Sequence, residues 1–253
     1  MRLNKYLASC GICSRREADQ LIEKGSVTVN GIAAAPGMQV EETDRVCVDG
    51  KEVRPAEGSV VLAFYKPLGV TCTDRDSHAE KTIKDVLNYP LRLSYAGRLD
   101  KDSEGLLLMS NDGKLIHQIS QGAFVQEKEY IVRVSAPLTE EFLQAMAAGV
   151  YLPELEVKTR PCTVRQTAPK VFHITLTQGL NRQIRRMCSV LHYHVESLMR
   201  IRIMNVMIGD LTPGQYYEVR GKQKEELYRM AGLTTGEKRG EKRGEKKHWR
   251  SGK

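Results

Sequence analysis

The sequence has few cysteines for its length and no long hydrophobic run. Six cysteines are scattered over 253 residues, which excludes the dense disulfide framework of a small secreted domain. No apolar run approaches the roughly 18 residues of a membrane-spanning helix, and the opening residues MRLNKYLASCGICSRR contain no apolar signal segment. We therefore expect reduced thiols, no membrane partner and a cytoplasmic location.

Motifs for cofactors and metals are also missing. No Gly-x-Gly-x-x-Gly or Walker pattern occurs, so nothing predicts nucleotide-dependent chemistry. Cys10 and Cys13 form one Cys-x-x-Cys, but a zinc site usually needs a second pair, and His192 and His194 are far away without a matching spacing. We expect no cofactor and no metal, and interpret the two cysteines as small residues near a helix end.

What is present is an ordinary globular composition with a basic excess at one end. Hydrophobic residues are 41% and charged residues 28%, enough for a sizeable core, and the formal net charge is +8. Residues 234–253 carry eight Lys or Arg against three Asp or Glu, in Gly-Glu-Lys-Arg repeats without apolar periodicity. We expect residues 233–253 to be a disordered basic tail, which either adds non-specific affinity for nucleic acid or is only a solvated extension.

Residues 1–59 predict a small domain of two helices and short strands. Apolar residues recur at helical spacing over residues 3–10, and Ser14 with Glu17 forms a capping box that starts a second helix. Asn30-Gly31 and Asp49-Gly50 are hairpin signals between short alternating segments. The length is near the lower limit for independent folding.

Polar residues of this domain suit a phosphate backbone, although charge alone favours a solvated helix face. They are Arg15, Arg16, Lys24 and Asn30. The ordered string RLNKYLASCGICSRREADQLIEKGSVTVNG resembles the S4 RNA-binding module throughout its core. This resemblance implies that residues 1–59 bind RNA.

After a linker at 55–59, residues 60–232 predict an α+β domain with a mixed, largely antiparallel sheet flanked by helices, because strands and helices do not alternate strictly. The patterns predict strands near 60–65, 105–109, 130–134, 171–176 and 195–206, and helices near 112–120, 139–148, 181–191 and 222–231.

The stretch from Tyr95 to Met109 concentrates charged residues and two glycines before an apolar strand. A charged surface turn is one interpretation, and a functional loop is the other. Asp100 and Asp102 are weak candidates for a carboxylate pair, because such pairs usually come from distant segments. A single buried Asp that faces an Arg is the simpler arrangement.

Candidate arginines lie in a helix expected after Gly179. Helical spacing turns Ile184, Met187 and Cys188 toward a core and spreads three arginines around neighbouring faces. These arginines are Arg182, Arg185 and Arg186. One of them can pair inward while the others meet phosphate, or all three can belong to a solvated basic helix.

The strings YAGRLDKDSEGLLLMSNDG, KEYIVRV, GLNRQIRRM and VESLMRIRIMNV resemble the signatures of the pseudouridine synthases. Together with the S4-like start they cover nearly all of residues 1–230. The set is similar to the ribosomal RsuA/RluB/RluE/RluF group, and GLNRQIRRMC with RIRIMN is most similar to the RluF type. The resemblance implies isomerisation of a uridine in ribosomal RNA.

The resemblance also implies roles for single residues. Asp100 matches the catalytic aspartate, Arg185 the basic residue paired with it, and Tyr130 the tyrosine that stacks on the target base. Leu198 matches the aliphatic residue of the pocket, and Arg98 would help hold the flipped nucleotide or the space it leaves. From the residues themselves, Tyr130 and Leu198 would be interpreted as core packing.

We therefore expect a monomeric RNA pseudouridine synthase that acts on 23S ribosomal RNA or a large-subunit particle. Asp100 could attack C1′, attack the base or abstract the 2′ proton, and the sequence does not decide among these routes. The alternatives are an RluB-type or small-subunit RsuA-type enzyme, a tRNA target, a catalytically silent ribosome-assembly protein, and a DNA-binding regulator.

Overall fold

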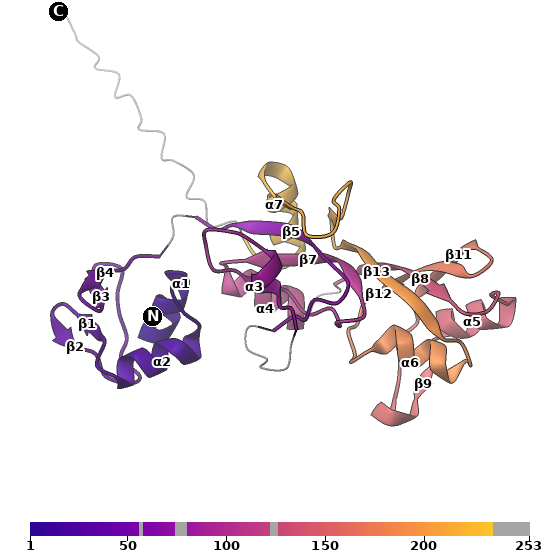
Figure 1. Cartoon of the computed structure of the whole chain (residues 1–253), viewed down its shortest axis with the longest axis horizontal. Coiled ribbons are helices and arrows are strands. Elements are labelled where there is room, and N and C mark those ends of the chain that lie inside the picture. The colour runs from indigo at the N-terminus through magenta and orange to yellow at the C-terminus, as the bar shows by residue number, and fades with distance from the viewer. Residues whose placement is uncertain (56–57, 74–79, 122–125, 235–253) are drawn as a thin grey trace, which may run out of the picture.

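The computed structural model describes residues 1–55, 58–73, 80–121 and 126–234, and these form two modules with separate sheets (Figure 1). We call residues 1–53 the N-terminal module and residues 60–234 the large module. Part of the expected linker, residues 56–57, and nearly all of the expected basic tail, residues 235–253, lie outside the described residues.

The N-terminal module packs two helices against a small antiparallel sheet of order β2-β1-β3-β4. Its elements are α1 (Leu3–Ser9), α2 (Arg15–Glu23), β1 (Val27–Val29), β2 (Ile32–Ala33), β3 (Val46–Val48) and β4 (Lys51–Glu52). The predicted capping box is confirmed, because Ser14 N donates to Glu17 Oε2 at 2.6 Å and Glu17 N donates to Ser14 Oγ at 3.2 Å. The predicted hairpin is confirmed too, with φ of 53° at Asn30 and 82° at Gly31.

The large module is built on a nine-stranded sheet of order β11-β12-β8-β13-β7-β5-β15, with β14 on β13 and β6 on β7. Its strands are β5 (Val61–Lys66), β6 (Ser94–Tyr95), β7 (Glu104–Ser110), β8 (Lys128–Val134), β11 (Thr163–Ala168), β12 (Val171–Leu176), β13 (Val195–Ile203), β14 (Val206–Met207) and β15 (Tyr216–Glu218). Only the short pairing of β13 with β7 is parallel among the described ladders. The predicted mixed, largely antiparallel sheet is confirmed.

Helices cover the sheet differently at its two ends. They are α3 (Ile83–Val86), α4 (Gly113–Gln121), α5 (Glu140–Ala148), α6 (Gln183–Val190) and α7 (Gly221–Met230). Strand β5 is buried along its whole length because Ala63 and its alternate neighbours pack with α4 and α7, whereas Phe64 packs in the cluster that contains α3. At the other end α5 and α6 cover one face of β8, β12 and β13 (Figure 1).

A smaller two-stranded sheet, β9 (Tyr151–Leu152) with β10 (Val157–Lys158), lies beside α6 and is joined by a short 3-10 turn, Pro153–Leu155. The junction between the two ends of the large sheet, where β7 meets β13, is therefore the place where two separately packed cores adjoin. Loops from both ends meet there.

One sequence expectation about strands was wrong in detail. The predicted strand at 195–206 ends at Ile203, because Met204 takes a left-handed φ of 52° and the chain turns back into β14. Strand β11 was not predicted, because its residues TVRQTA are partly exposed and mostly polar, which gives no apolar alternation to detect.

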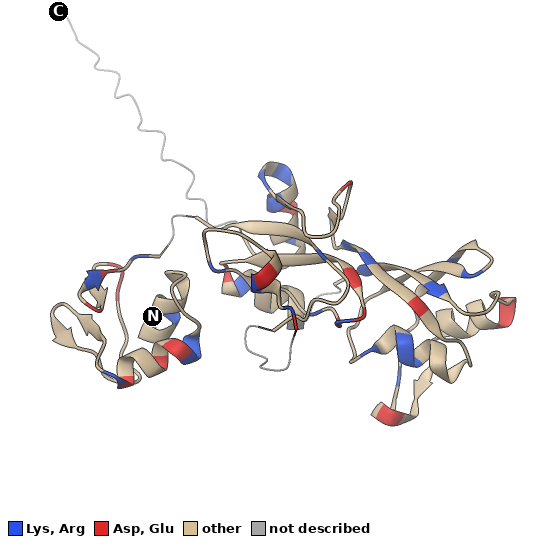
Figure 2. Ribbon diagram, viewed as in Figure 1, with Lys and Arg blue, Asp and Glu red and all other residues tan. Residues whose placement is uncertain are grey.

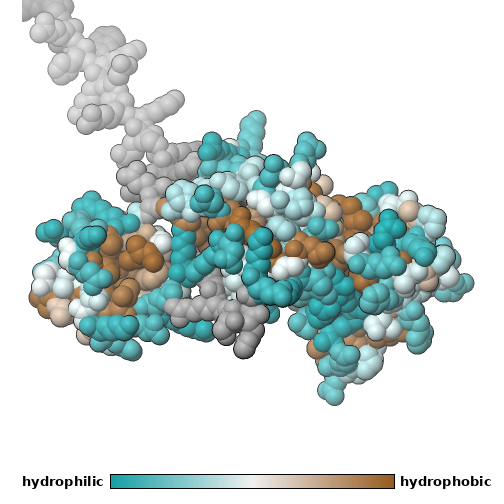
Figure 3. All heavy atoms as spheres, viewed as in Figure 1, coloured by the Kyte–Doolittle hydropathy of each residue, from teal (hydrophilic) through white to brown (hydrophobic). Residues whose placement is uncertain are grey.

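Hydrophilic residues cover most of the surface seen in Figure 3, and separate hydrophobic areas lie on the N-terminal module and on the large module. Across the described ranges, no helix is both long and apolar enough to cross a membrane. All six cysteines are described and all are free thiols, as expected.

Candidate active site

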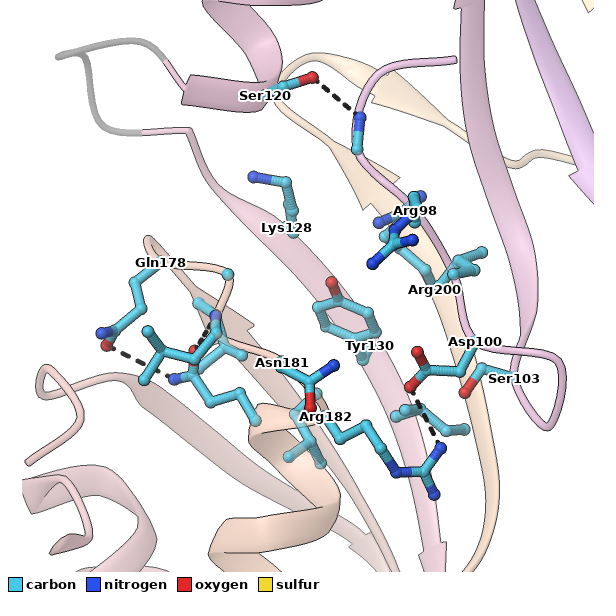
Figure 4. A pocket seen from close by; sticks show the side chains of 18 residues that line it. Arg98, Asp100, Ser103, Ser120, Lys128, Tyr130, Gln178, Asn181, Arg182 and Arg200 are labelled. Carbon is cyan, nitrogen blue, oxygen red and sulfur yellow. Dashed lines mark hydrogen bonds and ion pairs between the residues drawn. The ribbon is translucent and has the colours of Figure 1, made fainter. Parts of the chain in front are cut away.

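A pocket of about 320 Å³ opens at the junction of the two ends of the large sheet. It is bounded by the loop before β7, by the neighbouring strands β8 and β13, and by the loop that leads into α6 (Figure 4). Asp100, Tyr130 and Leu198 all line it. Three residues that the sequence placed in one site therefore meet in one cavity, although they come from three separate segments.

The loop that carries Asp100 is held by hydrogen bonds on both sides. Gly97 N donates to Ser120 Oγ at 2.9 Å, and Ser103 N donates to the Asp100 carbonyl at 3.1 Å. Below it, the fully buried Lys66 donates from Nζ to the Ser103 carbonyl at 2.6 Å and to the carbonyl of Pro67 at 2.9 Å. Because this loop is fixed by backbone contacts, the Asp100 carboxylate has a defined position at the pocket wall.

The Asp100 carboxylate faces Arg182, not Arg185. Arg182 Nη1 lies 3.5 Å from Asp100 Oδ2, and the same guanidinium donates to both oxygens of Asp102 at 3.2 and 2.9 Å. The expectation of a buried aspartate was also wrong, because 36% of the Asp100 side chain is exposed. The carboxylate is thus accessible to a molecule that enters the pocket.

The expected pairing of Arg185 with Asp100 is not found. Arg185 donates from Nη2 to the Asp102 carbonyl at 2.6 Å, and its Nε lies 3.3 Å from Asp102 Oδ2. The reason is the start of α6, where Arg182 adopts a left-handed φ of 51° and stands between the helix and the loop. Arg185, about one turn further along α6, reaches the backbone of Asp102 instead of the Asp100 side chain, and holds the loop there.

Asp102 is the carboxylate that organises both arginines. Burial works to raise its pKa, but the hydrogen bonds from Arg182 and the charges of Arg185 and Arg182 outweigh burial and hold the pKa of Asp102 below its usual value. In turn, the hydrogen bond that Arg182 donates to Asp102 raises the pKa of Arg182. Asp100 and Asp102 are therefore linked through one arginine.

Tyr130 and Leu198 form the floor of the pocket from two neighbouring strands. Tyr130 on β8 pairs with Arg200 on β13, and Leu198 pairs with Val132 in the same register. Both side chains also pack against the core cluster between the sheet and α6. The two interpretations from the sequence, core packing and pocket lining, therefore hold together, because these residues lie at the edge of that core.

The pocket residues that were not predicted from the sequence include two cations, Lys128 and Arg200. Lys128 lies two residues before Tyr130 and Arg200 two after Leu198, so each shares a strand face with a residue that was predicted. That alternation was the signal that could have identified them. Burial lowers the pKa of Lys128 to about 8, and the positive charge of Arg200 contributes to the same shift.

The predicted RNA-binding residues divide into available and occupied groups. Arg15, Arg16 and Lys24 are exposed, and no hydrogen bond or ion pair of their side chains is found within the described ranges. Asn30 is occupied, because its side chain donates to Asp44 Oδ1 and accepts from Arg45 N, both at 2.9 Å. Lys and Arg are spread over both modules (Figure 2).

The remaining predicted RNA-binding residues are Arg98, Arg182 and Arg186. Arg98 is exposed and lines the pocket. Arg182 also lines it but is engaged by Asp102. Arg186 is turned away from this pocket, because it is paired with Glu154 and bonded to the Asn181 carbonyl at 3.0 Å. Within the described part of the chain, no cluster of three or more His, Cys, Asp or Glu could hold a metal ion.

Comparison with known proteins gives a consistent result. Residues 60–190 match the family model for RNA pseudouridylate synthase, and residues 1–46 match the S4 domain. The chain is 44% identical over 239 residues to the dual-specificity RNA pseudouridine synthase RluF of Escherichia coli strain K12. The aligned region covers 94% of this chain and 81% of that protein.

More distant similarities agree. The chain is 34% identical over 220 residues to the ribosomal small subunit pseudouridine synthase A of Pasteurella multocida, which covers 85% of this chain and 94% of that protein. A crystal structure of a pseudouridylate synthase is similar with a TM-score of 0.66 at 28% identity, over 90% of this chain and 99% of that one.

Proposed function

Because this chain belongs to the RNA pseudouridylate synthase family, carries an S4 domain and is of the RluF type, we propose that it isomerises a specific uridine of 23S ribosomal RNA. The observation that carries the proposal is the accessible carboxylate of Asp100, which shares one pocket with Tyr130 and Leu198. We place this reaction in the cytoplasm and assign it to a monomer of two domains, residues 1–59 and 60–232.

A uridine within folded RNA must leave its stack to reach Asp100. Extrusion costs a few kcal/mol, and an aromatic side chain that stacks on the flipped base recovers part of that cost. Tyr130 suits this role because its ring lies in the pocket floor, between Asp100 and Lys128 (Figure 4). Leu198 supplies the apolar contact beside it, and exposed Arg98 suits the phosphate of the flipped nucleotide.

The reaction breaks the bond from N1 to C1′, turns the uracil in the pocket and joins C5 to C1′. Substrate and product are isomers, so the ring loses a proton at C5 and gains one at N1. Asp100 is available for any of the three routes, attack on C1′, attack on the base or removal of the 2′ proton. Arg182 lies 3.5 Å from the Asp100 carboxylate and leaves it accessible, as all three routes require.

Arg185 supports the site by position. It ties α6 to the Asp102 carbonyl and to the carbonyl of Val195, at 2.6 and 3.2 Å. We propose that Arg185 and Asp102 fix the loop on which Asp100 stands. The exposed Arg15, Arg16 and Lys24 of the N-terminal module then hold the RNA backbone, which sets position but not sequence.

The test is a map of pseudouridine in 23S and 16S rRNA and in tRNA, by carbodiimide modification and primer extension. A strain without the gene is complemented with wild type, Asp100→Asn or Asp102→Asn. We expect one 23S stop that wild type restores, that Asp100→Asn does not restore, and that Asp102→Asn restores in part, because Asp102 only positions arginines.

The outcome decides among the alternatives. A stop that moves to 16S rRNA would favour the RsuA-type specificity, and a stop only in tRNA would reject the ribosomal assignment. If Asp100→Asn restored the stop, the carboxylate would not be catalytic. The name of the relative in Escherichia coli describes a dual-specificity enzyme, so a second stop in another of the mapped RNAs, together with the 23S stop, would fit the proposal.

A further inference from the structure

Arg200 is a buried cation without a buried counterion. Only 2% of its surface is exposed, and its Nε donates to the Leu106 carbonyl at 2.7 Å. Its Nη2 is buried and has no hydrogen-bond partner in the described structure, and no carboxylate among the described residues pairs with it. Buried charges are normally paired and buried donors normally bonded, so this arrangement needs an explanation.

A second cation lies beside it. Lys128 lines the same pocket, and its Nζ finds only the carbonyl of Gln126, at 3.3 Å, among the described groups. The charge of Arg200 lowers the pKa of Lys128, after the larger effect of burial. Two neighbouring positive charges at a pocket wall repel each other, and a negative charge in the pocket would relieve this repulsion.

Position in the pocket distinguishes a phosphate from a base. The phosphate of a flipped nucleotide stays joined to the RNA strand and therefore remains at the mouth of the pocket, where Arg98 is exposed. Arg200 is buried on β13, directly opposite Tyr130 in the β8 register. The group that reaches this depth is the uracil ring that stacks on Tyr130.

The chemistry supplies the negative charge. When the N1–C1′ bond breaks, its electron pair stays on N1, and the uracil becomes an anion whose charge spreads to O2 and O4. Bond formation from C5 to C1′ then releases the C5 proton, and N1 takes up a proton, so that the product is neutral and isomeric with the substrate.

We propose that Arg200, supported by Lys128, is a catalytic residue that donates hydrogen bonds to the uracil anion formed during isomerisation. The inference rests on the proposed function only in that a uridine enters this pocket. Donors fixed by the fold and aimed at developing charge need no reorganisation during the reaction, which makes them effective in a site that excludes water. The bond to Leu106 fixes Arg200 in this way.

The test measures tritium release from total RNA labelled with [5-³H]uridine, taken from a strain without the gene, with full-length enzyme in excess. The limiting rate reports chemistry, and the enzyme concentration at half the limiting rate reports binding. We expect Arg200→Gln to lower the limiting rate by roughly 10²–10³-fold, the usual effect of removing one such donor, with half-saturation changed less than threefold. Arg200→Lys should retain more activity than Arg200→Gln.

Arg133→Gln is the matched control, because Arg133 is an exposed arginine of β8 outside the pocket, and its rate should equal wild type. An unchanged limiting rate in Arg200→Gln would overturn the proposal. The proposal would also be overturned if Arg200→Gln kept the wild-type limiting rate but needed more enzyme for half-saturation, with the slope of log affinity against log salt concentration reduced by about one. That pattern indicates a phosphate contact.

Arg200→Gln loses the bond to Leu106 and could fold poorly, so Lys128→Gln provides a second measurement that leaves this bond intact. A limiting rate at least several-fold below wild type, with unchanged melting temperature, supports the proposal, and a wild-type rate rejects it. Because total RNA contains the substrate whether it is rRNA or tRNA, failure of the 23S assignment would leave this comparison valid. Fractionated RNA tests that assignment separately.

Discussion

Gly105 is the residue whose replacement should most directly break the junction that forms the pocket. It takes a φ of +106°, and a Cβ there would lie 2.3 Å from the Arg200 carbonyl oxygen and 2.7 Å from Arg200 N. Both atoms are backbone, so no side-chain rotation can relieve the clash. The parallel pairing of β7 with β13 consists of only two residue pairs, one of them Gly105 with Arg200.

We therefore expect Gly105→Ala to separate β7 from β13. The positive φ costs about 1–3 kcal/mol for a residue with a side chain, and each lost ladder hydrogen bond adds about 1 kcal/mol. Together these give a loss of about 3–5 kcal/mol in the free energy of unfolding. The same shift moves Arg200 relative to Asp100, so turnover should fall as well.

The assay is urea unfolding followed by far-ultraviolet circular dichroism, with Gly113→Ala as the control. Gly113 lies in the first turn of α4 with ordinary φ and no atom within 4 Å of an added Cβ. Alanine there should be neutral or stabilise by up to about 1 kcal/mol. A loss below about 1 kcal/mol for Gly105→Ala would refute the argument that close backbone approach requires this glycine.

Two further predictions concern charge. Lys128 loses its proton near pH 8 in the folded chain and at about pH 10.4 in the unfolded chain. Between these pH values the unfolded chain binds more protons, so Lys128 makes the stability rise with pH. The urea midpoint should therefore rise less between pH 7.5 and pH 9.5 in Lys128→Met than in wild type, and an equal rise would contradict this. Deletion of residues 234–253 should weaken RNA affinity, most at low salt, without abolishing turnover in the tritium assay, and complete loss would place the tail in the site.

The extent of sequence-based prediction differed between fold and site for physical reasons. The capping box at Ser14 and the Asn30-Gly31 turn were predictable because each is a local interaction between residues at fixed spacing. Strand β5 was predictable because burial on both faces requires an unbroken apolar run. Strand β11 was not, because it lies at a sheet edge and its pairing with β12 depends on backbone groups that sequence does not display.

The site shows the same division. The resemblance located Asp100, Tyr130 and Leu198 in segments that do meet in one pocket. It could not show which arginine faces Asp100, because that depends on the left-handed backbone of Arg182 at the start of α6. A difference of three residues along the chain changes which carboxylate an arginine reaches, and only the three-dimensional structure shows which pairing forms.

Charged side chains surround the Asp100 carboxylate in the pocket. Arg182 is bound by Asp102 and approaches Asp100 only to 3.5 Å, so the Asp100 carboxylate remains accessible. Arg200 on β13 lies opposite Tyr130 on β8, which would hold the base, and its hydrogen bond to the Leu106 carbonyl fixes it there. In Figure 4 the Tyr130 ring lies between Asp100 and Lys128, so a base stacked on this ring would have a carboxylate on one side and an ammonium group on the other. We expect Arg200 and Lys128 to favour cleavage of the N1–C1′ bond, because this step leaves its electron pair on the uracil.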